Sequence, residues 1–293
     1  MNTLNIISYN MGTNIRDFAW ECEYLKQEID DSESGQQMYK KAQENTAKNL
    51  VDKASVYLLQ EVEKEDRALI VSLKIAGYAI FHILNNPNAP ENTKKRDSFD
   101  TAIALKMDVF EKIENHSKII NGYDTAIIST TYKLSEKRII FVSGHVPGFN
   151  LEETKLYKAD SLDGDKYCLT IINTLAEIEG TDMQIVGADM NANPEIMTKA
   201  GKKNNREWTH RFEEFEDAGF KIHRTKKATN VKPNSNYCKR ELDFIFVRTV
   251  LHTQHTKESF FKPNTLGNTT RLLKWDSSLN ASDHRPILTQ LPF

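Results

Sequence analysis

Polar side chains stand at the ends of apolar, strand-like runs along the whole of this sequence. The positions of this kind hold acids, amides and imidazoles, and they are Asn10, Glu61, His145, Asp189, Asn191, Asp243 and the adjacent pair Asp283-His284. A buried carboxylate without a partner is costly, so these positions together suggest that the side chains converge on one polar cleft. Carboxylate oxygens are hard ligands that suit Mg²⁺ or Mn²⁺, and such a cation supports hydrolysis by an activated water.

Each position also has an ordinary structural interpretation. An Asp-x-Asn after a strand, as in GADMNANP, is usually a turn with side-chain caps. Glu61 alone would be a solvated strand end, and His145 a histidine with satisfied hydrogen bonds; only their joint occurrence favours function. Other metal and nucleotide chemistry lacks its spacing, because the sequence has no HExxH, paired CxxC, EF-hand loop, GxxxxGK[ST] or nucleotide-type GxGxxG. We interpret Asp163-Gly164-Asp165 as a helix-capping turn.

Apolar patterning predicts a chain dominated by strands, with a few helices between them. Strands are predicted over residues 4–9, 54–60, 78–84, 101–106, 125–131, 138–144, 183–186, 242–247 and 287–291. Helices are predicted over residues 36–53, 166–179 and 207–218, and the polar segment 85–97, which contains two prolines, is predicted to be a loop. Without a visible repeat or linker, we expect a single domain over residues 1–293. Two sheets packed face to face with helices outside fit this pattern, and an open α/β sheet fits it almost as well.

Composition limits the choice of partner and compartment. The 293 residues carry a formal net charge of −2, so the chain lacks the basic excess on which dedicated nucleic-acid binders rely. Three widely separated cysteines, Cys22, Cys168 and Cys238, fit reduced thiols. No signal peptide or transmembrane run is visible, which makes the cytoplasm the default expectation. A protein delivered into host cells by a specialised secretion system would look the same.

Six motifs carry a definite resemblance to a known superfamily. In chain order they are IISYNMG, LLQEVE, VSGHVPG, VGADMNANPE, ELDFIFV and SDHRPI. In this order and at these distances they resemble the endonuclease/exonuclease/phosphatase superfamily, and the match runs from residue 4 to residue 291. That superfamily includes deoxyribonuclease I-like enzymes, apurinic-site endonucleases, neutral sphingomyelinases, inositol-polyphosphate 5-phosphatases and cytolethal distending toxin B subunits.

The resemblance implies both a fold and a metal-dependent activity. The implied fold is of the α+β class, a four-layered α/β/β/α sandwich of two packed, mostly antiparallel sheets flanked by helices. The implied activity is hydrolysis of a phosphate ester with Mg²⁺ or Mn²⁺ as cofactor. Glu61 resembles the principal metal ligand, with Asn10 beside it and Asp283 contributing to the metal site.

The same resemblance implies roles for the remaining site residues. Asp189 resembles the residue that orients or deprotonates the attacking water, and Asn191 resembles the one that holds a phosphate oxygen. His284 resembles the catalytic histidine, with Asp243 as its orienting carboxylate, and His145 resembles a second histidine that donates to phosphate oxygens. Whether Asp189 or His284 is the general base stays open at this point.

Basic and aromatic residues near the motifs suggest a polyanionic substrate. Lys95 and Arg96 lie in the predicted loop 85–97, Arg240 precedes the motif of Asp243, and Tyr123 could stack on a base. A solvated charged face and simple packing are the alternatives for these residues. We take Lys95, Arg96, Tyr123 and Arg240 as candidate substrate contacts and expect nucleic acid, DNA or RNA, as the partner.

Two departures from the deoxyribonuclease I-like pattern keep other substrates open. Glu63 stands where such enzymes often carry a phosphate-contacting arginine, and Tyr123-Asp124 stands where a second arginine is expected. The alternative is a phosphatase or phosphodiesterase acting on a phosphoinositide, a sphingophospholipid or a small nucleotide. A catalytically silent binding module is a third hypothesis, but a pure binder has no need of both metal ligands and a base.

Overall fold

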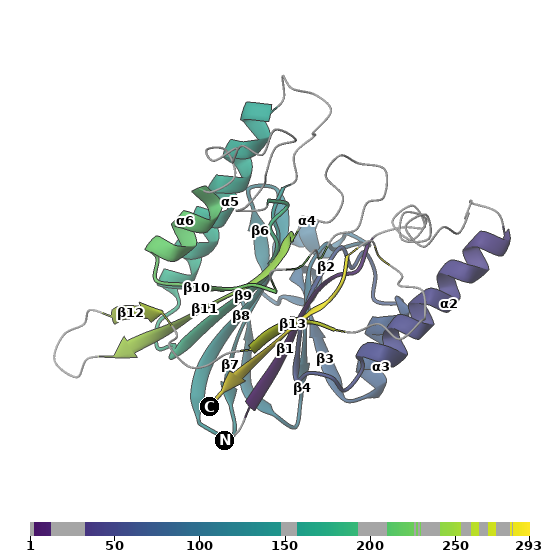
Figure 1. Cartoon of the computed structure of the whole chain (residues 1–293), viewed down its shortest axis with the longest axis horizontal. Coiled ribbons are helices and arrows are strands. Elements are labelled where there is room, and N and C mark those ends of the chain that lie inside the picture. Colours follow the sequence, from purple (N-terminus) through teal and green to yellow (C-terminus); the bar gives the residue numbers. More distant parts are fainter. Residues whose placement is uncertain are drawn as a thin grey trace.

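Two β-sheets packed face to face lie at the centre of the molecule, with helices on their outer faces (Figure 1). The computed structural model describes residues 3–12, 33–147, 157–192, 210–225, 227, 229, 241–252, 259–263, 269–273, 282 and 284–293. The first sheet has the strand order β13 (Thr269–Leu272), β14 (Ile287–Pro292), β1 (Thr3–Asn10), β2 (Val56–Gln60), β4 (Ala102–Lys106) and β3 (Tyr78–Phe81). The second has the order β10 (Lys221–His223), β11 (Asp243–His252), β9 (Met183–Asp189), β8 (Lys137–His145), β7 (Tyr123–Tyr132) and β5 (Phe110–Asn115), with β12 (Ser259–Pro263) beside β11 and β6 (Lys118–Ile120) beside β7.

Alternation of side chains along the strands produces the layers. In β1, Leu4 and Ile6 pack into the core between the two sheets, whereas Ile7 and Tyr9 pack under the helices of the first sheet. Strand β8 behaves in the same way, since Phe141 faces the first sheet and its neighbours on the strand face the helices on the other side. Each sheet is therefore apolar on both faces, which is why the strands read as nearly continuous apolar runs.

Helices cover the outer face of each sheet. α2 (Glu33–Leu50) and α3 (Ala68–Ile75) pack on the first sheet, and α5 (Tyr157–Glu177) and α6 (His210–Asp217) pack on the second (Figure 1). Within the described residues, only the pairs β1–β2 and β8–β9 are parallel, and every other strand pair is antiparallel. The expected four-layered α/β/β/α sandwich is confirmed.

Several elements differ from the sequence expectations. Residues 68–75 form α3, which we did not predict, because a short apolar run such as ALIVSLKI has no periodicity that separates helix from strand. The segment 85–97 is not wholly a loop, since it contains the end of the 3₁₀ helix η1 (Ile83–Asn85) and the short helix α4 (Glu91–Lys94). The capping turn expected at 163–165 is also wrong, because these residues lie inside α5.

A buried polar layer joins the two sheets just below the strand ends that carry the candidate site residues. Gln60, which is fully buried, donates through Nε2 to the Oγ of Ser143 at 3.0 Å and to the carbonyl oxygen of Leu58 at 3.1 Å. Ser143 in turn donates to the carbonyl oxygen of Leu59 across the sheet interface at 2.7 Å. Directional bonds between the sheets fix their relative position better than apolar contact alone.

The described part of the chain holds one of the three cysteines. Cys168 on α5 is buried and free, and burial raises the pKa of its thiol. Cys22 and Cys238 lie outside the described residues. Among the described helices, none is long and apolar enough to cross a membrane.

Candidate active site

Strand direction brings the predicted polar residues to one end of the sandwich. Asn10 ends β1 and is paired with the last residue of the parallel strand β2, which Glu61 follows. His145 and Asp189 end the parallel strands β8 and β9 and lie opposite each other in register. Asp243 begins β11, which runs antiparallel to β9, so it also lies opposite Asp189. This end of the sheets is opposite to the one at which both chain termini lie (Figure 1).

Asn10 links the two sheets through its side-chain amide. Its Nδ2 donates to Glu61 Oε1 at 2.8 Å and to Asp189 Oδ2 at 3.0 Å, and its Oδ1 accepts from the backbone N–H of Gly12 at 3.0 Å. In this arrangement Asn10 presents its amide N–H groups to both carboxylates and helps to hold them in place. Glu61 has a left-handed backbone with φ of 51°, a conformation that costs energy in a non-glycine residue and that occurs often at functional sites.

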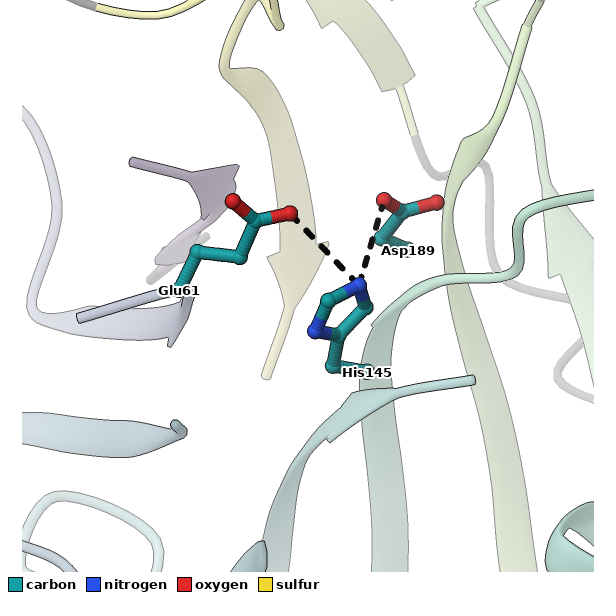
Figure 2. A group of neighbouring side chains, drawn as sticks. All are labelled: Glu61, His145 and Asp189. Atoms are coloured by element: carbon teal, nitrogen blue, oxygen red, sulfur yellow. Dashed lines mark ion pairs between the residues drawn. The ribbon is translucent and has the colours of Figure 1, made fainter. Parts of the chain in front are cut away.

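His145 points its ring between carboxylates of both sheets, as Figure 2 shows. Its Nε2 lies 3.5 Å from Glu61 Oε1 and 4.0 Å from Asp189 Oδ2, while its Nδ1 is 2.9 Å from Asp100 Oδ2. Burial lowers the pKa of His145, but the carboxylates of Asp100, Glu61 and Asp189 together raise it to about 10. This rise reflects the negative charge that the three carboxylates concentrate around the imidazole.

A second histidine has the same relation to Asp189. Nδ1 of His284 is 2.9 Å from Asp243 Oδ2, and its Nε2 is 3.7 Å from Asp189 Oδ2. Both aspartates are almost completely buried, and His284 is 5% exposed. Burial raises the pKa of Asp243, and the charge and hydrogen bond of His284 oppose that rise. A carboxylate held at Nδ1 fixes the tautomer and orientation of an imidazole and stabilises its protonated form.

Asn191 is attached to the strand ends on either side of it. Its backbone N–H donates to Asp189 Oδ1 at 2.8 Å, and its Nδ2 donates to the carbonyl oxygen of Val146 at 3.0 Å. Val146 in turn donates its own N–H to the carbonyl oxygen of Asp189 at 2.9 Å. A side-chain amide has two N–H donors, so the bond to Val146 leaves Asn191 able to contact a substrate oxygen.

The donor atoms fit a hard divalent cation. Two groups of side chains offer ligand atoms that all lie within 4.8 Å of one another, namely Glu61 with His145 and Asp189, and Asp189 with Asp243 and His284. Asp189 belongs to both groups, and the two groups contain three carboxylates. Carboxylate oxygens are what Mg²⁺ and Mn²⁺ prefer. The site therefore has the composition that a divalent cation requires.

The candidate substrate contacts have mixed positions. Lys95 is exposed, but the guanidinium of Arg96 forms a two-point ion pair with the buried carboxylate of Asp124, at 2.6 and 2.9 Å. Tyr123 is 38% exposed. Its ring meets that of Tyr167 edge to face. The remaining two predicted site residues, Arg240 and Asp283, lie outside the described residues.

Sequence reasoning missed Asp100, which holds His145. It lies just before β4 in SFDTAIAL, and only the tertiary structure shows that this carboxylate faces a strand end 45 residues away. Asp124 in turn holds Asp100 in place, because its Oδ2 accepts a hydrogen bond from the backbone N–H of Asp100 at 3.2 Å. Like Asp243, Asp100 stands at the beginning of an apolar strand, so its position could have flagged it. No motif marks it, however, and its contact with His145 exists only once the two sheets are stacked.

Comparison with known proteins identifies the fold. No protein-family model matches the sequence, and no curated protein matches it either. An endonuclease/exonuclease/phosphatase from Bacteroides vulgatus has a similar structure, with 14% identity, 100% of this chain and 99% of that chain covered, and a TM-score of 0.58. A mannosyl-6-phosphatase from Bacteroides thetaiotaomicron is 13% identical over 99% of this chain and 100% of its own, with a TM-score of 0.58.

The human Nocturnin catalytic domain, solved with a bound sulfate anion, is also similar. It is 13% identical over 98% of this chain and 93% of its own, with a TM-score of 0.56. At this level of identity the likeness defines the architecture. The chain has the fold of the endonuclease/exonuclease/phosphatase proteins, as its six motifs predicted.

Proposed function

We propose that this protein is a divalent-metal-dependent phosphoesterase that cleaves a phosphate ester with an activated water. The observation that carries the proposal is the convergence of Glu61, Asp189 and the His284–Asp243 pair, with each imidazole held at Nδ1 by a carboxylate. A bound Mg²⁺ or Mn²⁺ would supply charge neutralisation for the anionic phosphate and would lower the pKa of a coordinated water. Glu61 and Asp189 would hold that cation.

Other side chains of the protein would carry out proton transfer and bind the phosphate group. His284 is placed to orient the attacking water and to take its proton, because its Nε2 lies 3.7 Å from Oδ2 of Asp189, one of the two proposed cation ligands. Asp243 holds His284 in the productive orientation. Nε2 of His145 and the second amide N–H of Asn191 are placed to donate to phosphate oxygens, whose charge grows as the bond to water forms.

We infer that the substrate is a nucleic-acid phosphodiester. Support comes from Lys95, which is exposed at the end of α4, and from Tyr123, whose ring is partly exposed. In the sequence, further basic residues lie around Arg240, just before Asp243. Their positive charge would favour the binding of a polyanion.

A small phosphate ester is the second candidate, and one contact favours it. Arg96 is engaged by Asp124, so its charge is already neutralised and contributes little to the attraction of a polyanion. The similarity to a mannosyl-6-phosphatase agrees with a substrate of this size. Phosphoinositides, sphingophospholipids and small nucleotides remain in this second class.

A substrate panel tests both parts of the proposal. Purified protein would be incubated with Mg²⁺ against plasmid DNA, single-stranded RNA, an inositol-lipid set and sugar phosphates, and the same reactions would be repeated with excess chelator. We expect cleavage of nucleic acid that needs the metal and that falls on the order of 10²- to 10³-fold in Glu61→Gln.

Glu63→Gln is the matched control, because Glu63 lies two residues from Glu61 and its side chain is 45% exposed. It should keep full activity. Release of phosphate from lipids or sugars alone would move the assignment to the second candidate. Turnover that survives chelation, or that survives Glu61→Gln, would contradict the proposed chemistry.

A further inference from the structure

A completely buried arginine, Arg211, reaches from the helical layer to the strand ends that carry the site. It is the second residue of α6 and has 0% exposure. Its Nη1 donates to the carbonyl oxygen of Met190 at 2.8 Å and to that of Pro147 at 3.3 Å, and its Nε donates to Asp165 Oδ1 at 3.2 Å. Burying a guanidinium is costly unless it is paired and hydrogen-bonded, and these contacts satisfy its Nε and Nη1 atoms.

The two carbonyl groups belong to the segments that carry the proposed catalytic residues. Met190 separates Asp189 from Asn191, and Pro147 lies two residues after His145. Both follow the last residues of β8 and β9, where the ladder that holds the strands together comes to an end. Backbone carbonyls at such a point require another donor, and Arg211 supplies it to both segments from a single nitrogen.

Gly164 makes room for this side chain. A Cβ placed on Gly164 would lie 1.9 Å from Nη2 and 2.2 Å from Cζ of Arg211. Glycine weakens the interior of a helix, so its presence within α5 calls for a local reason. The passage of the guanidinium across α5 is that reason, and Asp165, the next residue, provides the counter-charge.

We propose that Arg211 is a positioning residue for the phosphoester site, which it serves by fixing the segment after β8 to the segment after β9. Arg211 touches neither cation nor substrate. It holds together the segments that directly follow His145 and Asp189, and through them it maintains the alignment of His145, Asp189 and Asn191 with the phosphate and the attacking water. The expected effect on catalysis rests on the proposed function. The link between the segments after β8 and β9 is a statement about the fold and does not depend on that function.

Arg248 provides a matched control. Within the described part of the chain it is the second arginine that is almost completely buried, with 1% exposure, and it donates to the carbonyl oxygen of Ala218 at 2.9 Å and stacks on Phe220. Arg248 pairs in register with Gln184, five residues along the sheet from the pair of Asp243 and Asp189, which is about 17 Å at the rise of a strand. Arg211→Lys and Arg248→Lys therefore perturb the same layers at different distances from the site.

The first measurement is steady-state kinetics of both variants below their unfolding temperatures. Lysine keeps the charge but loses the planar fork that serves carbonyls and Asp165 together. We expect Arg211→Lys to lower kcat by about 10- to 100-fold with little change in KM, the scale that a misplacement of about 1 Å costs. Arg248→Lys should leave kcat unchanged even where it lowers the unfolding temperature. Equal losses of kcat in both variants would overturn the proposal.

Amide hydrogen exchange gives a readout that does not need activity. We expect faster exchange in Arg211→Lys, but not in Arg248→Lys, at the N–H groups of Val146, Met190 and Asn191, which are bonded at the strand ends. This arm decides the structural claim even if the protein hydrolyses no tested ester. Unchanged exchange at these amides would overturn it.

Gly164→Ala tests the same contact from the other side. The added methyl displaces the guanidinium, so this variant should reproduce the kinetics of Arg211→Lys while leaving every polar side chain intact. In the double variant Gly164→Ala/Arg211→Lys, the losses of kcat should not add, because both substitutions disturb the same contact. Additive losses would show that Gly164 acts independently of Arg211 and would contradict the assignment.

Discussion

At the scale of single residues, two histidines approach one carboxylate in the same way. Each imidazole is held through Nδ1 at 2.9 Å, His145 by Asp100 and His284 by Asp243, and each directs Nε2 toward Oδ2 of Asp189. His145 ends β8 of the second sheet, and His284 lies just before β14 of the first, so Asp189 is the point at which the halves of the site meet. Orientation of both rings by carboxylates is what preorganised proton transfer requires.

Asp100 should matter to catalysis although no motif marks it. We expect Asp100→Asn to lower kcat by about 10- to 100-fold, the usual effect of losing the carboxylate that orients a histidine at a metal site. Asp97→Asn, at an exposed position three residues earlier, is the control. Steady-state kinetics decide the matter, and wild-type turnover in Asp100→Asn would show that His145 needs no such partner.

His223 at the end of β10 should make the fold sensitive to acid. It is 5% exposed, and burial, together with the charge of Lys221, lowers its pKa to about 4. Its pKa in the unfolded chain is about 6.5, so the folded form binds fewer protons, and stability is lost as the pH falls from about 6.5 towards 4. The loss attributable to this residue is on the order of 3 kcal/mol.

Urea unfolding of wild type and His223→Gln at pH 7 and pH 4.5 measures this effect. The variant should be the less stable protein at neutral pH, because it loses buried packing, and should lose less stability on acidification. An identical pH dependence of the two proteins would exclude His223 as a source of acid sensitivity.

Residue types and strand-end positions were enough to predict which side chains gather at one end of the sandwich. Glu61, His145, Asp189 and Asp243 all follow or begin apolar runs, so the pattern locates them. Asp100 escaped because contact with His145 depends on how two sheets are stacked, which no local pattern encodes.

At the scale of elements, the approach of the two sheets depends on a glycine beneath the site. A Cβ at Gly187 in β9 would lie 2.5 Å from Cδ1 of Leu58 in the facing sheet and 2.9 Å from the Oγ of Ser8. A Cβ at Gly144 in the neighbouring β8 would meet Tyr167 at 3.4 Å or more, which is ordinary contact. An added methyl group is therefore expected to clash with the facing sheet at Gly187 and to fit at Gly144.

Gly187→Ala should destabilise the protein, whereas Gly144→Ala should not. Overpacking between the sheets is expected to lower the free energy of unfolding by about 1–3 kcal/mol. The alanine at Gly144 should change it by less than about 0.5 kcal/mol, the usual limit for substitutions that disturb no contact. Denaturant unfolding of both variants is the measurement, and comparable stability would mean that the sheets are not in tight contact at Gly187.

Element prediction failed where a local signal pointed the wrong way. An Asp-Gly-Asp sequence favours a turn, yet residues 163–165 lie within α5. The glycine there leaves room for Arg211, which no local pattern of the sequence reveals. Helix α3 escaped for another reason, since the first half of ALIVSLKI holds no polar residue that would mark a helical period, although Val71 and Ile75 are exposed in the structure.

At the scale of the whole molecule, the candidate cation site joins the two halves of the sandwich. Glu61 follows a strand of the first sheet, and Asp189 ends a strand of the second. Asn10 already connects the two carboxylates by hydrogen bonds. A divalent cation held by both would add a further link between the sheets, so its binding should stabilise the native fold as a whole.

Thermal unfolding with and without Mg²⁺ tests this link. At a Mg²⁺ concentration about 100 times the Kd, the free energy of unfolding should rise by about 2.7 kcal/mol. Glu61→Gln should remove most of this gain, and Glu63→Gln should keep it. A gain of the same size in Glu61→Gln would place the cation elsewhere.

The architecture could be predicted only through the motifs. Periodicity alone fits an open α/β sheet nearly as well as two stacked sheets, because both outer and inner faces of these sheets are apolar. Six motifs in register selected the sandwich, which the structure confirms. That the 293 residues form one domain stays our proposal, and the two sheets share one core that is consistent with it.

The most direct test is crystallographic. Crystals of the protein soaked in Mn²⁺ would give an anomalous difference map in which the metal can be located without reference to activity. We expect a single strong peak at the strand ends, with carboxylate oxygens of Glu61 and Asp189 as ligands at about 2.0–2.2 Å, as is usual for small hard cations. The absence of a peak there in Mn²⁺-saturated crystals, or its appearance away from Glu61, would contradict the account.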